Sequence, residues 1–540
     1  MENGSSSNGS TAAGCCNGNG SNAACAVRGP HVAMLATPGM GHLIPLAELA
    51  KRLASRHGAT ATLITFASTA SATQRAFLDS LPPAVTSLSL PPVDLSDLPR
   101  GAAIETLMSE ECARSVPALT SILLDLKRST GGRLAAFVAD LFGADSLDAA
   151  RAAGVRRRCI FFPSNLHALT LILHLPELDA SVRCEFRDLP EPLRLPGCVP
   201  IPGPDILMPL QDKSDPCYRW MVHHGEKYRD ADAILVNSFD AVEPGPAKIL
   251  RQPADHRPAV YPIGPLIHAV GRRDDKDALC LEWLDRQPAR SVIFVSFGSG
   301  GALPTEQMRE LALGLELSGQ RFLWVVRSPS YEGAVNDNYY DAESKKDPFA
   351  YLPEGFVDRI TASGVGLVVP SWAPQTKVLA HAATGGFLTH CGWNSVLESL
   401  VYGVPMVAWP LYAEQKQNAV MLSDGVGAAL RVPESKGRRR SRPRCGGGDA
   451  GRREGRRGQG PRWPSCKRPP PRASATGAPP PPRWPRWWRG GRRQVDKRRT
   501  RVMLMLTRLT PSDPPHPPAR AGPAIYFGPC ACRVLGLVVL

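Results

Sequence analysis

The feature that constrains the fold most is an apolar run that ends in a glycine turn and passes at once into a helical pattern. Residues 31–38, HVAMLATP, are apolar almost throughout, which is typical of a strand buried on both faces of a parallel sheet. The turn GMGH follows, and residues 42–58 then carry apolar side chains at helical spacing. TATLITF at 60–66 is predicted to be a second strand. This strand–turn–helix–strand order predicts an α/β domain.

The same alternation recurs along the chain and divides it into two similar halves. The further candidate strands are 134–140 and 233–239 in the first half, and 291–299, 321–327, 364–372, 385–392 and 404–410 in the second. Two α/β halves predict two doubly wound domains that face a cleft, with ligands outside the carboxyl ends of the strands. We expect an N-terminal domain over 30–265 and a C-terminal domain over 266–435.

The charge of the chain is concentrated in one segment. The formal net charge is +15, which by itself suggests an anionic partner. Residues 436–501, however, hold 23 of the 64 Lys and Arg residues and three of the 49 Asp and Glu residues. The remainder has 41 basic against 46 acidic residues and is mildly acidic, so the charge does not indicate that the folded part binds nucleic acid.

The two ends of the chain differ in composition from the rest. Residues 1–29 are rich in Gly, Ser and Asn and have no apolar core run, which predicts a disordered leader and not a signal peptide. Residues 436–540 are dominated in their first part by Pro, Arg and Gly without helical or strand periodicity, which predicts a disordered tail.

Cysteine spacing and hydropathy limit the cofactor and the compartment. The 14 Cys residues have no zinc-finger spacing, so we expect free thiols and no bound metal. No stretch reaches the roughly 18 apolar residues that span a bilayer. Without an export signal, we expect a cytoplasmic protein with no transmembrane segment.

Residues 372–415 hold an unusual density of polar and aromatic groups. Within them, THCGWNSVLES takes a predicted strand directly into a predicted helix. A helix N-terminus offers free N–H groups and partial positive charge, so it can bind phosphate. His390, Asn394 and Ser395 would add side-chain donors. The alternative needs no ligand, because Ser395 and Glu398 have the spacing of a capping box.

Other residues near this turn suit a nucleotide and a sugar. Trp372 offers a flat face for a base, and Glu398 could accept hydrogen bonds from ribose, although a helical Glu is more often solvated. Glu414 and Gln415 provide an acceptor and a donor for vicinal sugar hydroxyls. Ser299 lies in a Gly-rich turn that is either a second phosphate contact or a simple connection.

A second constellation lies at TPGMGH, residues 37–42. His42 stands where a strand passes into a helix, and a neutral imidazole suits a general base near pH 7. Asp140 ends the strand candidate 134–140 and could hold the imidazole in one tautomer. Asp145 and Asp148 are alternatives to Asp140, and a helix-capping or core role is the alternative for His42.

Together these segments resemble a known family. Residues 372–415, from WAPQ through HCGWNS to an acidic residue plus Gln, resemble the 44-residue signature of plant UDP-dependent glycosyltransferases of secondary metabolism. TPGMGHLIPLAELAKRL, QRFLWVVRSPS and other stretches extend the resemblance over about 31–435. They look most like the hydroquinone and monolignol glucosyltransferase branch. The resemblance implies the GT-B fold, two Rossmann-like doubly wound domains facing a cleft.

The resemblance also implies a reaction and residue roles. We expect an inverting, metal-free transfer of glucose from UDP-glucose to the hydroxyl of a small phenolic acceptor, by a monomer. A terminal Gln is usual in glucose users. The implied roles are general base for His42 and orienting partner for Asp140; uracil binding for Trp372 and the Ala373 backbone; ribose binding for Glu398; diphosphate binding for Ser299, His390, Asn394 and Ser395; and donor-sugar contact for Thr37, Trp393, Glu414 and Gln415.

The resemblance stops near residue 435. The family continues there with helices that cross back to the N-terminal domain, whereas 437–540 switches abruptly to Arg, Gly, Pro and Trp. We hypothesise that this segment is translated out of frame, through a sequencing or gene-model error or a genuine frameshift. An intact frame through codon 440 in the resequenced transcript would refute the error. Two alternatives are an inactive homologue that keeps the donor site, and a basic tail that binds nucleic acid, although the tail has no RNA-binding module.

Overall fold

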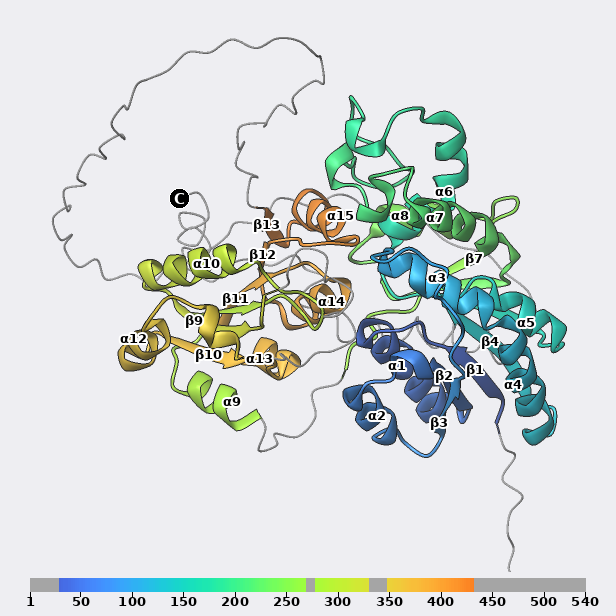
Figure 1. The fold of residues 1–540 in the computed structure, drawn as a ribbon, viewed down its shortest axis with the longest axis horizontal. Coiled ribbons are helices and arrows are strands. Elements are labelled where there is room, and N and C mark those ends of the chain that lie inside the picture. Colours follow the sequence, from blue (N-terminus) through green and yellow to red (C-terminus); the bar gives the residue numbers. More distant parts are fainter. Residues whose placement is uncertain (1–28, 269–276, 330–346, 432–540) are drawn as a thin grey trace, which may run out of the picture.

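The structure, a computed structural model, describes residues 29–268, 277–329 and 347–431. The predicted leader over 1–29, except for its last residue, and the predicted tail over 436–540 lie outside the described residues. Two parallel sheets organise the described chain, and Figure 1 shows them side by side, with α14 and α15 of the second turned toward the first.

The first sheet has seven strands in the order β3-β2-β1-β4-β5-β6-β7. The strands are β1 (His31–Leu35), β2 (Thr60–Phe66), β3 (Val85–Leu90), β4 (Leu134–Asp140), β5 (Arg157–Phe162), β6 (Ala233–Val236) and β7 (Ala259–Pro262). The order reverses between β1 and β4. The register pairs Leu35 with Ala139, so β1 and β4 end side by side at this switch point.

Helices cover both faces of the first sheet. They are α1 (Met40–His57), α2 (Ala72–Asp79), α3 (Ile104–Arg114), α4 (Val116–Ser129), α5 (Ser146–Ala152), α6 (Leu166–Ser181), α7 (Pro216–Lys227) and α8 (Pro244–Leu250). Successive β1 residues enter different cores: Ala33 packs on one face, and Val32 and Met34 on the other. This explains why the strand is apolar throughout, since a sheet covered on both faces has no polar side.

The second sheet has six parallel strands in the order β10-β9-β8-β11-β12-β13. The strands are β8 (Val292–Ser296), β9 (Arg321–Val326), β10 (Gly366–Pro370), β11 (Thr384–Thr389), β12 (Met406–Ala408) and β13 (Ala429–Arg431). The helices are α9 (Ala278–Asp285), α10 (Thr305–Ser318), α12 (Phe356–Ser363), α13 (Gln375–Ala380), α14 (Trp393–Tyr402) and α15 (Gln415–Val420). Its switch point lies between β8 and β11, where Ser296 pairs with Thr389.

The α/β class with two doubly wound units is confirmed. Each predicted strand is present, although most are shorter than their apolar runs. Four strands were not predicted, namely β3, β5, β7 and β13. The helix α1 begins at Met40, two residues before the predicted start, so His42 lies in its first turn. Within the described ranges, no helix combines the length and apolarity needed to cross a membrane.

Candidate functional site

The carboxyl ends of the two sheets face a common cleft. Its empty volume, including the open mouth, is about 1470 Å³. The first domain contributes the start of α1 and parts of α3, α6 and α7, and the second contributes the turns after β8 and β11 and the segment before α15. Both switch points open into this cleft, which is where open α/β sheets bind ligands. The predicted residues that line it are His42, Ser299, His390, Trp393, Asn394, Ser395, Glu414 and Gln415.

At the first switch point, one imidazole is fixed by a buried carboxylate. His42 Nδ1 lies 2.7 Å from Asp140 Oδ2, and the Asp140 side chain is fully buried. The Thr37 hydroxyl donates to the same carboxylate oxygen and lies 3.2 Å from His42 Nδ1. Because Nδ1 faces a carboxylate, it carries the proton, and Nε2 is the basic nitrogen. Asp145 pairs instead with His223 at 2.9 Å, and Asp148 with Arg151 at 2.7 Å.

The environment of His42 favours the protonated imidazole. Burial acts to lower its pKa, but the charge of Asp140 and the hydrogen bond to it outweigh burial, so the pKa lies above the usual 6.5. The charges of Glu414 and Glu105 act in the same direction. A carboxylate next to an imidazole stabilises the protonated ring and so raises its affinity for a proton.

At the second switch point, another imidazole lies between two glycines. A Cβ added at Gly298 would meet the His390 ring at 2.6 Å, and one added at Gly392 would meet Nε2 at 2.3 Å. Gly298 also has φ of 78°, which favours glycine. Burial lowers the pKa of His390 to about 4, so the ring is neutral at pH 7. Among the described residues, no group hydrogen-bonds its buried Nδ1.

The helix after this turn begins without a side-chain cap. Its N-cap is Gly392, and neither Ser395 nor Glu398 closes a capping box, so that interpretation is wrong. The amide of Gln375 instead donates to Ser395 Oγ at 2.9 Å and to Glu398 Oε2 at 2.8 Å. The N–H groups of the first turn of α14 therefore remain for an anion in the cleft.

Glu398 is not the solvated residue that a helical Glu usually is. Burial raises its pKa to about 7, although the hydrogen bond from Gln375 acts in the opposite direction. Trp372 and Ala373 lie just before Gln375, outside the cleft lining. Trp372 is 58% exposed, which leaves it accessible to a ligand, and Ala373 is buried.

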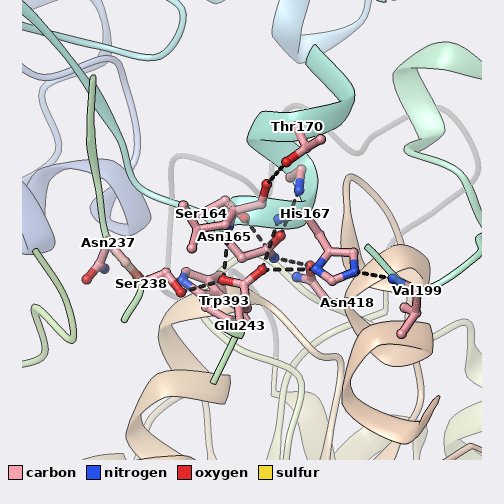
Figure 2. A network of polar contacts seen from close by, with 12 residues as sticks. Ser164, Asn165, His167, Thr170, Val199, Asn237, Ser238, Glu243, Trp393 and Asn418 are labelled. Atoms are coloured by element: carbon pink, nitrogen blue, oxygen red, sulfur yellow. Dashed lines mark hydrogen bonds and ion pairs between the residues drawn. The ribbon is translucent and has the colours of Figure 1, made fainter. Parts of the chain in front are cut away.

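Two of the predicted donor residues also join the domains. Trp393 Nε1 donates to the Asn237 carbonyl at 2.7 Å, and both residues are visible in Figure 2. Asn394 Nδ2 donates to the Gly41 carbonyl at 2.9 Å, beside His42. The α14 turn is therefore held against the first domain by side chains that the sequence associates with ligand binding.

Glu414 and Gln415 lie side by side at the start of α15 but are held differently. Glu414 Oε1 accepts from Ser164 Oγ at 3.1 Å and from Asn418 Nδ2 at 3.3 Å. Gln415 Oε1 accepts from two backbone N–H groups, those of Leu411 at 2.8 Å and Tyr412 at 3.0 Å. Ser299, in contrast, is an exposed residue of the cleft wall.

Sequence reasoning missed the wall of the cleft on the first domain. This wall is mainly apolar: Ile104, Met108, Phe142, Phe162, Ile172 and Met221. They come from five separate elements or their loops, so no local motif marks them. Glu105 and Ser164 add the polar groups, and burial raises the pKa of Glu105 to about 6. A buried carboxyl close enough to act on a predicted base is a sign of a functional site. The sequence alone does not show that Glu105 acts on His42, because only the fold brings them together.

Two doubly wound domains with both switch points at a shared cleft match the GT-B arrangement that the resemblance implies, and comparisons with known proteins agree. The profile of the family described as "UDP-glucoronosyl and UDP-glucosyl transferase" matches residues 249–436. UDP-glycosyltransferase 72B1 of Arabidopsis thaliana is 52% identical over 407 residues, 74% of this chain and 83% of that protein. Hydroquinone glucosyltransferase of Rauvolfia serpentina is 52% identical over 404 residues, 74% of this chain and 84% of that protein.

Solved structures give the same result. A UDP-glucosyltransferase from Polygonum tinctorium, described as capable of glucosylating indoxyl, is 49% identical with a TM-score of 0.69, over 76% of this chain and 86% of that one. Phytolacca americana UGT2, complexed with UDP-2fluoro-glucose and pterostilbene, is 46% identical with a TM-score of 0.68, over 76% and 86%. The chain belongs to the plant UDP-glycosyltransferase family and is a transferase.

Proposed function

We propose that this enzyme transfers glucose from UDP-glucose to the hydroxyl of a small phenolic acceptor with inversion at C1, giving a β-glucoside. The observation that carries the proposal is the His42–Asp140 pair at 2.7 Å on one wall of a cleft whose opposite wall is the open N-terminus of α14. The names of two relatives support glucose as the sugar and hydroquinone as one acceptor class.

His42 would act as the general base. Its Nε2 accepts the proton of the acceptor hydroxyl while the oxygen attacks C1 of glucose from the face opposite UDP. The bond between C1 and the UDP oxygen breaks, and its electron pair leaves with UDP. Asp140 stabilises the imidazolium that forms, and Thr37, whose hydroxyl is bound to Asp140, supports that carboxylate in place of the sugar contact expected from the sequence.

The donor would bind across the second domain. The first-turn N–H groups of α14, with Ser395, Asn394 and Ser299, would hold the diphosphate, and neutral His390 would add a donor without charge. These groups stabilise the negative charge that develops on UDP, so we propose that no metal is needed. Trp372 would stack on uracil and the Ala373 backbone would bind it, Glu398 would bind ribose, and Trp393, Glu414 and Gln415 would contact glucose.

The acceptor would lie against the apolar wall of the first domain. Aromatic and aliphatic side chains there suit a flat, mostly apolar molecule. The cytoplasmic location and the monomeric state expected from the sequence stay predictions.

A transfer assay on the full chain tests the proposal. The purified protein is incubated with UDP-glucose and a panel of phenols that includes hydroquinone, with and without EDTA, and the anomeric proton of the product is read by NMR. We expect a β-glucoside at the same rate with the chelator present. An α-glucoside, or a rate abolished by EDTA, would contradict the mechanism.

The same assay decides the inactive alternative. A chimera in which residues after 435 are replaced by the corresponding segment of the Rauvolfia serpentina relative serves as the comparison. Transfer by the chimera but not by the chain, with UDP bound by both, would support an inactive homologue.

A further inference from the structure

We propose that Asn165 and Asn418 form a positioning pair across the domain boundary, which sets Glu414 and the turn around Cys391 for UDP-glucose. This inference rests on the proposed role of Glu414 in contacting the donor sugar. Neither asparagine lines the cleft, and both side chains are completely buried. The pair therefore acts through its neighbours and does not touch the substrate.

The contacts form a continuous path from one domain to the other. Asn165 Nδ2 donates to Asn418 Oδ1 at 2.6 Å, and Figure 2 shows the two side chains pointing toward each other. Asn418 Nδ2 then donates to the Cys391 carbonyl at 2.9 Å and to Glu414 Oε1 at 3.3 Å. Ser164, the neighbour of Asn165, donates directly to the same Glu414 oxygen at 3.1 Å.

The orientation of both amides is fixed by groups that cannot reverse their roles. Asn418 Nδ2 faces a carbonyl and a carboxylate, neither of which can donate, so its oxygen must face Asn165. Asn165 Oδ1 accepts from the Ala168 N–H at 2.8 Å, and a backbone N–H cannot accept. The Asn165 nitrogen must therefore face Asn418, and the hydrogen bonds run in one direction from the first domain to the second.

The first-domain end of this path is rigidly anchored. Asn165 is the N-cap of α6, a helix of 16 residues. Glu243, 1% exposed, accepts from the Leu166 N–H at 3.0 Å and the His167 N–H at 2.9 Å, which completes the cap. The free N–H groups of this helix are thus used within the protein, and the Asn165 side chain has a fixed origin from which to reach Asn418.

The second-domain end of the path is part of the donor site. Cys391 separates His390 from Gly392 and has φ of 64°, an uncommon conformation for a residue other than glycine. A hydrogen bond to its carbonyl helps to hold that conformation. At Glu414, the hydrogen bonds from Ser164 and Asn418 both reach Oε1, which leaves Oε2 to bind a sugar hydroxyl. Glucose recognition thus depends on a contact from the acceptor domain.

Binding measurements on the full chain separate positioning from general stability. The affinities of UDP and of UDP-glucose are measured by calorimetry for the wild type, Asn165→Ala, Asn418→Ala and the double variant. Asn418→Ala removes the hydrogen bond to Glu414, and Asn165→Ala removes the one that orients the Asn418 amide. We therefore expect each single variant to bind UDP-glucose about tenfold more weakly, with UDP affinity, which does not depend on Glu414, falling by a smaller factor of about two. The double variant should lose no more UDP-glucose affinity than the weaker-binding single variant, because both substitutions interrupt the same path of hydrogen bonds.

Two further variants sharpen the test. Asn418→Asp keeps the acceptor for Asn165 but places a carboxylate against the Cys391 carbonyl and Glu414, so it should weaken UDP-glucose binding more than Asn418→Ala. Asp205→Asn is the matched control, because Asp205 also joins the domains, through Arg431 at 2.7 Å, yet neither residue lines the cleft. It should leave both affinities unchanged.

Each result is decisive. Equal weakening of UDP and UDP-glucose, additive single effects, or wild-type affinities would overturn the positioning role. If the asparagine variants fail to fold by near-UV circular dichroism, Ser164→Ala decides, because it removes the direct donor to Glu414 and the 3.4 Å contact from Asn165 Nδ2 but leaves both asparagines in place. We expect a selective loss of UDP-glucose affinity of about threefold, and no loss would overturn the coupling. Failure of the wild type to transfer glucose would instead refute the proposed function and leave this binding test intact.

Discussion

His42 and His390 both lie beside the switch point of their own sheet, on opposite sides of it, and have opposite electrostatic environments. Each follows a strand next to the switch point of its sheet and lines the same cleft. The Asp140 carboxylate raises the pKa of His42 against the effect of burial, whereas burial alone lowers the pKa of His390 to about 4. One imidazole is prepared to take a proton, and the other stays neutral.

The difference comes from what the neighbouring strand supplies. In the first sheet, β4 ends in a carboxylate that reaches Nδ1 of the imidazole. In the second sheet, β8 passes into a turn whose Gly298 leaves room for the ring but offers no charge. The same topology therefore suits both proposed roles, a base on the proposed acceptor side and a neutral hydrogen-bonding group on the proposed donor side.

The largest expected effect is the loss of the base. His42→Ala should lower kcat/KM for a phenolic acceptor by about 10²- to 10⁴-fold, because proton transfer loses its acceptor. UDP affinity, measured by calorimetry, should stay within about twofold, since His42 lies on the acceptor side. A large loss of UDP affinity would show that His42 supports the donor site and would break the comparison.

Removing the carboxylate should make His42 resemble His390. Asp140→Asn should reduce kcat by at least about 10²-fold, since the imidazolium loses its partner and the tautomer is no longer fixed. In the wild type, His42 acts when unprotonated, so kcat/KM should fall as pH drops through a pKa above 6.5. The residual activity of Asp140→Asn should show this limb at lower pH. An unmoved acidic limb would contradict the assignment of His42 as the titrating base.

Filling the space beside His390 should affect the donor side alone. In Gly298→Ala, the new methyl group would meet the ring at 2.6 Å, and the φ of 78° would be strained. We expect UDP-glucose to bind about tenfold more weakly, the equivalent of roughly 1.4 kcal/mol. Gly319→Ala is a control with similar φ, 59°, and no neighbouring atom within 4 Å. Equal effects of the two variants would attribute the loss to the backbone and not to His390.

The smallest expected effect concerns Glu398, the carboxyl group on α14. Its folded pKa, about 7, lies above the usual 4.5, so its contribution to stability is present below pH 4.5 and is lost as pH rises through 7. In Glu398→Gln the side chain cannot ionise, so this loss of stability with rising pH does not occur. Without ligand, its Tm should equal that of the wild type at pH 4.5 and exceed it by about 2–4 °C at pH 8. A constant difference across this range would contradict the buried ionisation.

Much of the fold followed from the sequence because buried parallel strands have a simple pattern. HVAMLATP and SVIFVSFGS are apolar on both faces, and each lies at the centre of its sheet. The missed strands lack that pattern: VTSLSL of β3 alternates at the sheet edge, and RRCIFF of β5 begins with two arginines. β13 has only three residues, too few for any periodicity.

The site was predictable where chemistry and topology coincide within a short segment. His42 follows the turn after β1, and Asp140 is the last residue of β4. Because β1 and β4 are neighbours in the sheet, the two side chains meet. The capping box failed because the spacing of Ser395 and Glu398 is also the spacing of two side chains that Gln375 can bridge. The Asn165–Asn418 contact joins residues 253 positions apart, and no local pattern marks either one.

A titration of the two histidines tests the central claim most directly. The full chain is labelled with ¹³Cε1-histidine, the signals of His42 and His390 are assigned from His42→Gln and His390→Gln, and both are followed by NMR between pH 4.5 and 9. We predict a midpoint above 6.5 for His42 and a His390 signal that is neutral over most of this range and begins to titrate only near its acidic end. A His390 midpoint near or above 6.5, or a His42 midpoint below it, would contradict the account.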